Sequence, residues 1–263
     1  MTIDASRGAL AVNQALLALG NERFEADCGT FIRNRSVREI RDANHVAHVT
    51  AATPEEIERL LARVEREFQG FPYQRFDLDF TTPPGFEVRL AFEGYQHADL
   101  LVMLLEGELT TDAKPCEIRP VTDDAGWEAY AALHKVDWRE YVPRLGQPEG
   151  VWTARAMVRS RRAKSPPVNY WLACVDNEPR AYCASWAGVG GVGQVDDLFT
   201  HPDFRQRGLA SALVRHCVAD CRKHGANAVV IVADPADTPK QMYAGVGFRP
   251  VAVTRHYWKS VEP

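Results

Sequence analysis

The stretch from residue 194 to residue 224 constrains the fold more than any other part of the chain. Residues 194–200 have the apolar content of a strand, and Pro202, which has no backbone N–H group, ends it. A helix is expected to begin near Gly208 and to end at Gly225. Its apolar residues recur every four positions and form one stripe: Leu209, Leu213, Cys217 and Cys221. A strand, a short polar loop and a helix in this order predict an α/β fold.

The loop between this strand and helix is suited to bind phosphate. The first turn of a helix has free N–H groups and a positive partial charge, and such an end binds phosphate oxygens. Gly208 lets the backbone approach a ligand, and Arg205 and Arg207 add charge for a diphosphate. A solvated basic turn before an ordinary helix is the alternative, because short glycine motifs have many false positives.

Two motifs together resemble a known family. Residues 205–210 (Arg-Gln-Arg-Gly-Leu-Ala) fit the pattern Arg/Gln-x-x-Gly-x-Gly/Ala, and residues 241–248 (Gln-Met-Tyr-Ala-Gly-Val-Gly-Phe) follow further along the chain. They resemble the acetyl-CoA pyrophosphate loop and the Leu-Tyr-x-x-x-Gly-Phe signature of the GNAT N-acetyltransferase superfamily, with Met242 in place of leucine. The resemblance implies the GNAT acyl-CoA N-acyltransferase fold, an α/β fold with a mixed sheet, and acetyl-CoA as cosubstrate.

The resemblance also implies which residues contact acetyl-CoA. In this family the central strand is splayed, and its free backbone groups pair with the pantetheine arm, while the loop and the first helical turn hold the diphosphate. Carried onto this sequence, the cofactor-binding residues are Leu198, Phe199, Thr200, Arg205, Gln206, Arg207, Gly208, Leu209, Ala210 and Ser211.

Acetyl transfer to an amine needs a proton acceptor and a proton donor. Tyr243 is the candidate acid, because a phenol with a pKa of about 10 is protonated at neutral pH, and the resemblance places this tyrosine beside the cofactor sulfur. Asp196 and Asp197 are the candidate bases on the central strand, where strict alternation would send them to opposite faces. We favour Asp196 as the base, with Asp197 bracing the sheet or loop. A water relay and a purely structural pair are the alternatives.

The N-terminal half of the sequence echoes the C-terminal half. Residues 90–95 precede an expected strand as residues 243–248 do, with Leu90 in the place of Tyr243, and no Arg-x-x-Gly-x-Gly/Ala loop occurs before residue 200. This pattern predicts a tandem chain: residues 1–112 as a degenerate GNAT-like domain without cofactor, which walls the acceptor side, and residues 113–263 as the catalytic domain. The alternative is that glycine–aromatic pairs recur by chance.

Four further segments of the sequence predict local structure. Thr53, Pro54 and Glu56 predict a helix start with a capping box. Residues 150–163 predict a helix with a solvated basic face. Residues 188–193 are glycine-rich and predict a flexible connection, and residues 251–258 are expected to close the sheet.

Composition and charge narrow the class of protein. The net charge of −4 offers no basic excess for nucleic acid, and no signal peptide or membrane span is evident, so we expect a cytoplasmic protein that binds neither nucleic acid nor membrane. None of the six cysteines forms a Cys-x-x-Cys pair. Cys217 and Cys221 share a helix face, where buried packing is favoured over metal binding, so no metal is expected.

The expected activity is acetyl-CoA-dependent N-acetylation of a primary amine by direct attack in a ternary complex. The acceptor is a small-molecule amine or a peptide amino group, and small amines, amino acids, aminoglycosides and protein amino termini all stay open. The competing function is a non-catalytic acetyl-CoA- or CoA-binding regulatory protein. A third alternative is a scaffold protein whose N-terminal half serves only to dimerise, and a homodimer is one assembly that stays open.

Overall fold

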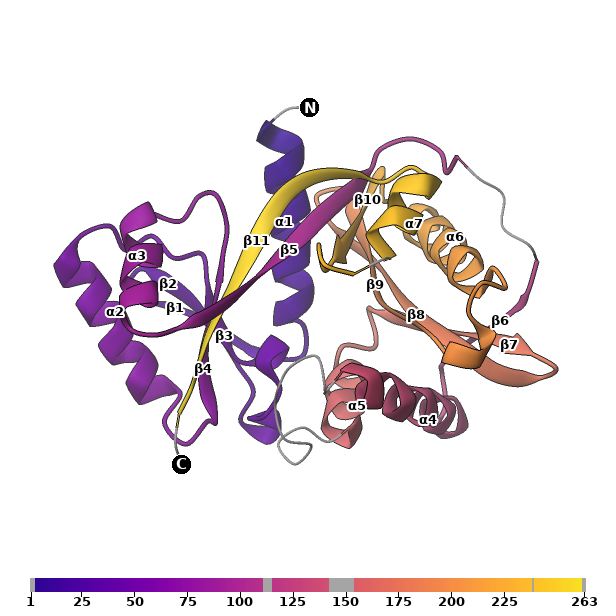
Figure 1. Cartoon of the computed structure of the whole chain (residues 1–263), viewed down its shortest axis with the longest axis horizontal. Coiled ribbons are helices and arrows are strands. Elements are labelled where there is room, and N and C mark those ends of the chain that lie inside the picture. Colours follow the sequence, from indigo (N-terminus) through magenta and orange to yellow (C-terminus); the bar gives the residue numbers. More distant parts are fainter. Residues whose placement is uncertain (1–2, 111–114, 142–153, 238, 262–263) are drawn as a thin grey trace.

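Figure 1 shows the computed structural model, which describes residues 3–110, 115–141, 154–237 and 239–261. The N-terminal elements are α1 (Ile3–Ala18), β1 (Glu22–Ala26), β2 (Gly29–Arg33), η1 (Arg35–Val37), η2 (Arg41–Ala43), β3 (His45–Ala47), α2 (Pro54–Glu67), β4 (Tyr73–Leu78), α3 (Pro84–Phe92) and β5 (Gln96–Leu105). The C-terminal elements are β6 (Glu117–Pro120), α4 (Asp124–Tyr141), α5 (Ala154–Ala163), β7 (Asn169–Val175), β8 (Glu178–Val189), β9 (Val192–Thr200), η4 (Pro202–Phe204), α6 (Leu209–Lys223), β10 (Ala228–Ala233), α7 (Pro239–Val246) and β11 (Arg249–Ser260).

The strands form one mixed sheet in the order β1-β2-β3-β4-β11-β5-β10-β9-β8-β7-β6. Two sets of elements repeat within it: β1-β2-β3-α2-β4-α3-β5 and β7-β8-β9-α6-β10-α7-β11. In each set the third and fourth strands are parallel neighbours joined through a helix, as β3 and β4 are and as β9 and β10 are. The sheet therefore contains two copies of one arrangement, facing each other.

The two copies exchange their last strands. β11 pairs with β4, β5 pairs with β10, and β5 and β11 pair antiparallel with each other at the middle of the sheet. Figure 1 shows these two strands side by side along the centre of the molecule. The expectation that residues 251–258 close the sheet is wrong, because β11 lies between two other strands instead of at an edge.

The similar sequence segments at residues 90–95 and 243–248 form two helix ends of the same geometry. The carbonyl of Leu90 accepts from the N–H of Tyr95 at 3.0 Å, and the carbonyl of Tyr243 accepts from the N–H of Phe248 at 3.0 Å. α3 and α7 thus each end in the same turn before the two exchanged strands. The domain boundary expected between residues 112 and 113 lies outside the described residues and stays a prediction.

The hydrophobic core of the C-terminal half includes N-terminal residues. Met103 and Leu105 of β5 pack with α6 on one face of the sheet, and Val102 and Leu104 pack with α1 and α4 on the other. A separate core lies under α2 and α3. Since α1 and β5 both contribute to the C-terminal core, this core is not complete without the N-terminal part of the chain.

The helix start at Thr53 is confirmed. The Thr53 hydroxyl accepts from the N–H of Glu56, and the Glu56 carboxylate accepts from the N–H of Thr53, which together form the capping box. The flexible connection expected at residues 188–193 is wrong, because β8 and β9 form a tight hairpin there. Gly188 has a φ of +76°, and a Cβ on it would lie 1.7 Å from the carbonyl oxygen of Val192. No described helix is long and apolar enough to cross a membrane.

Candidate functional site

The site begins where β9 and β10 separate. Their parallel pairing covers only Val192–Val195 with Ala228–Ile231, although β9 continues to Thr200. Beyond Val195 the described partner of β9 is β8. Asp196 is therefore the first residue after the two strands part, and the backbone of Leu198 and Thr200 lies along an edge that β10 does not cover.

A β-bulge lies at this same point of β9. The register with β8 shifts between Tyr182 and Ala184, and Asp197 has a left-handed φ of +56°. Such a bulge re-aims side chains and interrupts strict alternation. The charges of Arg161 and Lys164 act on both carboxylates. The expectation that Asp196 and Asp197 point to opposite faces stays a prediction.

Asp197 is held in its ionised form by neighbours from two helices. The Tyr130 hydroxyl donates to Oδ2 of Asp197, and Arg161 approaches it with Nε 3.3 Å from Oδ2 and Nη2 3.3 Å from Oδ1. Burial alone would raise the pKa of Asp197, but Arg161, His134 and the Tyr130 hydrogen bond hold it below its usual value. The expected solvated basic face is thus wrong for Arg161, which is 8% exposed.

The pKa of Asp196 shifts in the opposite direction from that of Asp197. Burial and the neighbouring charge of Asp197 raise its pKa, and Arg161 and Lys164 oppose the rise only in part. Two adjacent carboxylates whose pKa values are pushed apart are the arrangement from which enzymes obtain one fixed charge and one proton acceptor. Asp196 therefore has the properties of a base, and Asp197 those of a structural anion.

Tyr243 lies in α7 and is buried in the core cluster that contains Cys183 and Val195. Burial raises the pKa of its phenol, and the charges of Cys183 and Asp196 raise it further. The hydroxyl is therefore protonated at neutral pH and is a hydrogen-bond donor. The charge of Asp196, the candidate base, thus acts on the hydroxyl of Tyr243, the candidate acid.

The N-terminus of α6 is open. Gly208 occupies the N-cap position with a φ of +88°, no side chain caps the helix, and a Cβ at Gly208 would meet nothing within 4 Å. The exposed loop residues turn away from the first turn: Arg205 bonds to the carbonyl of Thr200 and to Glu140, and Arg207 lies over the Phe204 ring. This end can admit a diphosphate without a steric or charge conflict.

The other predicted binding residues flank this end. Gln206 is exposed, Ala210 and Ser211 are half-buried, and Leu209 is buried in the core below α6. The Phe199 ring packs on Tyr182 at 5.4 Å between centroids, so its side chain belongs to the core.

The helix that corresponds to α6 in the other copy is closed. The Glu56 carboxylate at the start of α2 accepts from the N–H groups of Ala52 and Thr53 at 2.9 and 3.0 Å. A carboxylate of the chain itself thus lies at this helix end, and the Thr53 hydroxyl accepts from the first-turn N–H of Glu56. The two backbone bonds lower the pKa of Glu56.

Cys217 and Cys221 lie in the core below α6, as the packing interpretation expects. Within the described part of the chain, no group of three His, Cys, Asp or Glu residues is placed to hold a metal ion.

The acetyltransferase (GNAT) family matches residues 127–248, which contain the splayed strand, the open helix end and Tyr243. These residues form a GNAT acetyltransferase domain. The GNAT domain spans both motifs on which the sequence resemblance rests, and the resemblance is confirmed. No curated protein matches the chain.

Solved structures extend the similarity to the whole fold. A GCN5-related N-acetyltransferase from Kribbella flavida is 18% identical and has a TM-score of 0.71 over 100% of this chain and 97% of its own. A functionally unknown conserved protein from Staphylococcus epidermidis is 14% identical, with a TM-score of 0.69 over 92% and 95%. A tandem GNAT protein from the clavulanic acid biosynthesis pathway is 11% identical, with a TM-score of 0.59 over 98% and 97%. The chain thus has the mixed α/β fold of GNAT proteins, including a tandem one.

Four residues of the site escaped the sequence reasoning: Tyr130, Arg161, Lys164 and Asp42. Arg161 is hidden in a run of arginines, and only tertiary contacts distinguish it from its exposed neighbours. Lys164 is 3% exposed, although lysines are seldom buried. Asp42 lies more than a hundred residues from Arg161 in the sequence, and no local pattern points to it.

Proposed function

We propose that this protein is an acetyl-CoA-dependent N-acetyltransferase that acts on a primary amine in a ternary complex. The observation that carries the proposal is the open N-terminus of α6 directly after the splayed end of β9, with Asp196 at the point of separation. A bound thioester group lying along this edge would have a proton acceptor and a proton donor beside it.

The residues present fit acetyl-CoA. The diphosphate would bind the N–H groups of the first turn of α6, with Arg205 and Arg207 free to turn toward it. The backbone of Leu198 to Thr200 would pair with the pantetheine arm, as an added strand pairs with an open edge. Acetyl-CoA supplies the activated acetyl group.

The chain's own residues would then move two protons. Asp196 accepts a proton from the acceptor amine as the nitrogen forms its bond to the thioester carbonyl carbon. The carbon–sulfur bond breaks with its electron pair on sulfur, and Tyr243 donates its hydroxyl proton toward the departing thiolate. The products are an N-acetylated amine and CoA, and solvent restores the two side chains.

A non-catalytic CoA-binding regulatory protein is the second candidate. It would need the open end of α6 but neither the raised pKa of Asp196 nor a buried, protonated Tyr243 on which the charge of Asp196 acts. These two features favour the enzyme, since groups with perturbed pKa values gather at catalytic sites.

The experiment is thiol release from acetyl-CoA with a panel of small amines, amino acids, aminoglycosides and peptides. We expect at least one acceptor to release CoA in step with acetylated product, and we expect Asp196→Asn to lower kcat roughly 100-fold or more while acetyl-CoA still binds. Acetyl-CoA binding without turnover on any acceptor would favour the regulatory protein instead.

The N-terminal copy belongs to the same proposal. We infer that residues 1–112 are a degenerate GNAT-like domain and residues 113–263 the catalytic one, with one acetyl-CoA per chain, because Glu56 occupies the second helix end. The N-terminal copy would line the acceptor side. A cytoplasmic location and a homodimer stay predictions.

A further inference from the structure

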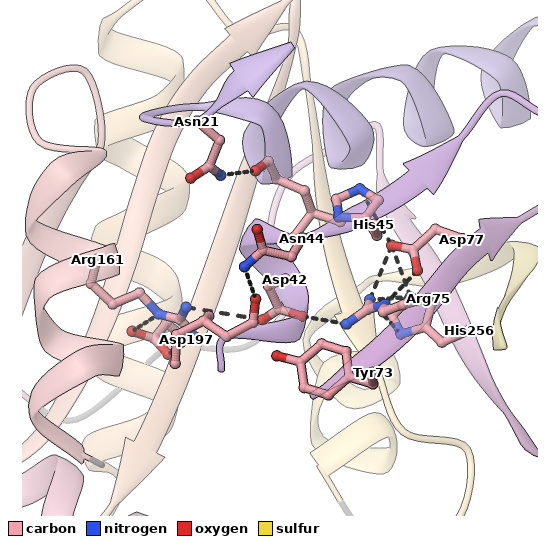
Figure 2. A network of polar contacts seen from close by, with 12 residues as sticks. Asn21, Asp42, Asn44, His45, Tyr73, Arg75, Asp77, Arg161, Asp197 and His256 are labelled. Carbon is pink, nitrogen blue, oxygen red and sulfur yellow. Dashed lines mark hydrogen bonds and ion pairs between the residues drawn. The ribbon is translucent and has the colours of Figure 1, made fainter. Parts of the chain in front are cut away.

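A series of charged side chains runs from the N-terminal copy to β9 (Figure 2), and in it Arg75 and Arg161 are buried while Asp42 is half-buried. Arg75 of β4 donates from Nη1 to Oδ1 of Asp42 in η2 at 2.8 Å. The other carboxylate oxygen of Asp42 lies 4.0 Å from Nη1 of Arg161 in α5, and Arg161 contacts Asp197 of β9. Four side chains from four separate elements thus alternate in charge.

Arg75 and Asp42 are each held by several contacts. Arg75 is 3% exposed and also binds Asp77, with Nε 2.6 Å from Oδ1 and Nη2 3.0 Å from Oδ2, and its Nη2 lies 2.8 Å from Nδ1 of His256. Arg75 is therefore rigid, and it fixes Asp42 in turn. Burial alone would raise the pKa of Asp42, but Arg75, Arg161 and Lys164 hold it far below its usual value. Asp42 is a permanent anion.

We infer that Asp42 is a positioning residue for acetyl transfer, because it holds Arg161 against Asp197 and so keeps the β9 bulge in the conformation that presents Asp196. The inference rests on the proposed function, in which Asp196 is the base. Among the described residues, Arg161 has two carboxylate partners, one from each copy, and removing Asp42 would leave it with Asp197. Asp197 needs such support because its left-handed backbone conformation is unfavourable for a residue with a side chain.

The same contact sets the electrostatics around Asp196. The described groups whose charges act on it or respond to it are Asp197, Arg161, Lys164, Asp42, Tyr170 and Tyr243. Among them, the negative charge of Asp42 raises the pKa of Asp196. Removing that charge should therefore lower the pKa of Asp196. If Asp42 had a purely structural role, its removal would leave this pKa unchanged.

The test compares Asp42→Asn with the full-length wild type on an acceptor found in the amine panel. We expect kcat to fall about tenfold or more, as a small displacement of a reacting group does, with the acetyl-CoA Kd unchanged. The acidic limb of the kcat–pH profile should move to lower pH, and Asp42→Glu should restore part of kcat. Asp124→Asn is the matched control, because Asp124 pairs with Arg162, the neighbour of Arg161, in an exposed ion pair.

Three results would overturn the inference. The first is a kcat in Asp42→Asn equal to that of the wild type. The second is a lower kcat together with a lower Tm and an unchanged acidic limb of the kcat–pH profile. If Asp42→Asn does not fold, Arg161→Lys takes its place, since lysine keeps the charge but not the two-pronged contact, and an unchanged kcat there is equally contrary. A wild type that acetylates no amine contradicts the proposed function itself, whereas an active wild type with these results contradicts only the role of Asp42.

Discussion

At the scale of single residues, the proposed diphosphate site depends on Gly208. Its left-handed backbone and the empty space around it leave the first turn of α6 uncovered. A glutamate at this position would place a negative charge where the phosphates should lie, and like charges in contact cost several kcal/mol. For Gly208→Glu we expect the acetyl-CoA affinity to fall by at least about 100-fold in calorimetry.

Gly225→Glu controls for backbone strain. Gly225 also has a positive φ with open space around it, but it lies at the opposite end of α6. The Gly225→Glu variant should bind one acetyl-CoA per chain, as the wild type does. Equal affinities for the two variants would remove the diphosphate assignment.

Tyr243 should matter for turnover more than for affinity. Tyr243→Phe removes one hydroxyl and leaves the ring in its core position against Phe248. If the hydroxyl supplies the proton, kcat should fall by about 100-fold, with acetyl-CoA affinity little changed. Steady-state thiol release and calorimetry measure the two quantities. Tyr95→Phe, which removes a buried hydroxyl bonded to Gln74 in the other copy, is the control, and wild-type kcat in Tyr243→Phe would assign the phenol to packing alone.

At the scale of secondary-structure elements, the starts of α2 and α6 show the same helix end used in two ways. α2 is closed by its own capping box, which stabilises the helix, whereas α6 leaves its end open. The open end of α6 therefore forgoes the stabilisation that a capping side chain gives, as is common where a helix end must remain free for a ligand.

The stabilising effect of the capping box can be measured. Thr53→Ala removes the oxygen that accepts from the N–H of Glu56. Loss of an N-cap hydroxyl costs about 1 kcal/mol, so the urea midpoint should fall accordingly, while acetyl-CoA affinity stays as in the wild type. Thr53→Ser keeps the oxygen and should restore most of the stability. No change of midpoint in Thr53→Ala would mean that the α2 start contributes nothing to folding.

At the scale of the whole molecule, the buried charges between the copies make stability depend on pH. Burial and the charge of Arg75 lower the pKa of His256 from its ordinary value of 6.5 to about 4. The unfolded chain therefore binds a proton at His256 before the folded chain does. By linkage, the stability that neutral His256 provides is complete above about pH 6.5 and is lost as the pH falls toward about 4.

The free energy of unfolding should thus be lower near pH 5 than near pH 7. His256→Gln removes this titration and should reduce the difference, as urea unfolding at the two pH values would measure. His224→Gln, at a half-exposed site, should leave the difference as it is in the wild type. An unchanged difference in His256→Gln would mean that His256 does not couple protonation to folding.

The sequence by itself determined the elements and the local chemistry of this protein. Periodicity placed α2, α6 and β10 because an apolar face must be buried whatever the partner is. The two motifs identified the family, since the glycine at a helix start and the Tyr-x-x-x-Gly-Phe turn depend on local backbone geometry. The capping box at Thr53 was predictable for the same reason.

Only the tertiary structure decided what lies between the two copies. The exchange of β5 and β11 places strands beside partners that a sequence of separate domains would not suggest, because strand pairing depends on long-range contacts. The bulge of β9 at Asp197 has no local signal in the sequence, and Arg161 is a buried partner of Asp197 although Arg162 beside it is exposed. Asp42 pairs with Arg75 and Arg161 for the same reason, because buried charges are stable only where oppositely charged side chains from other elements meet them.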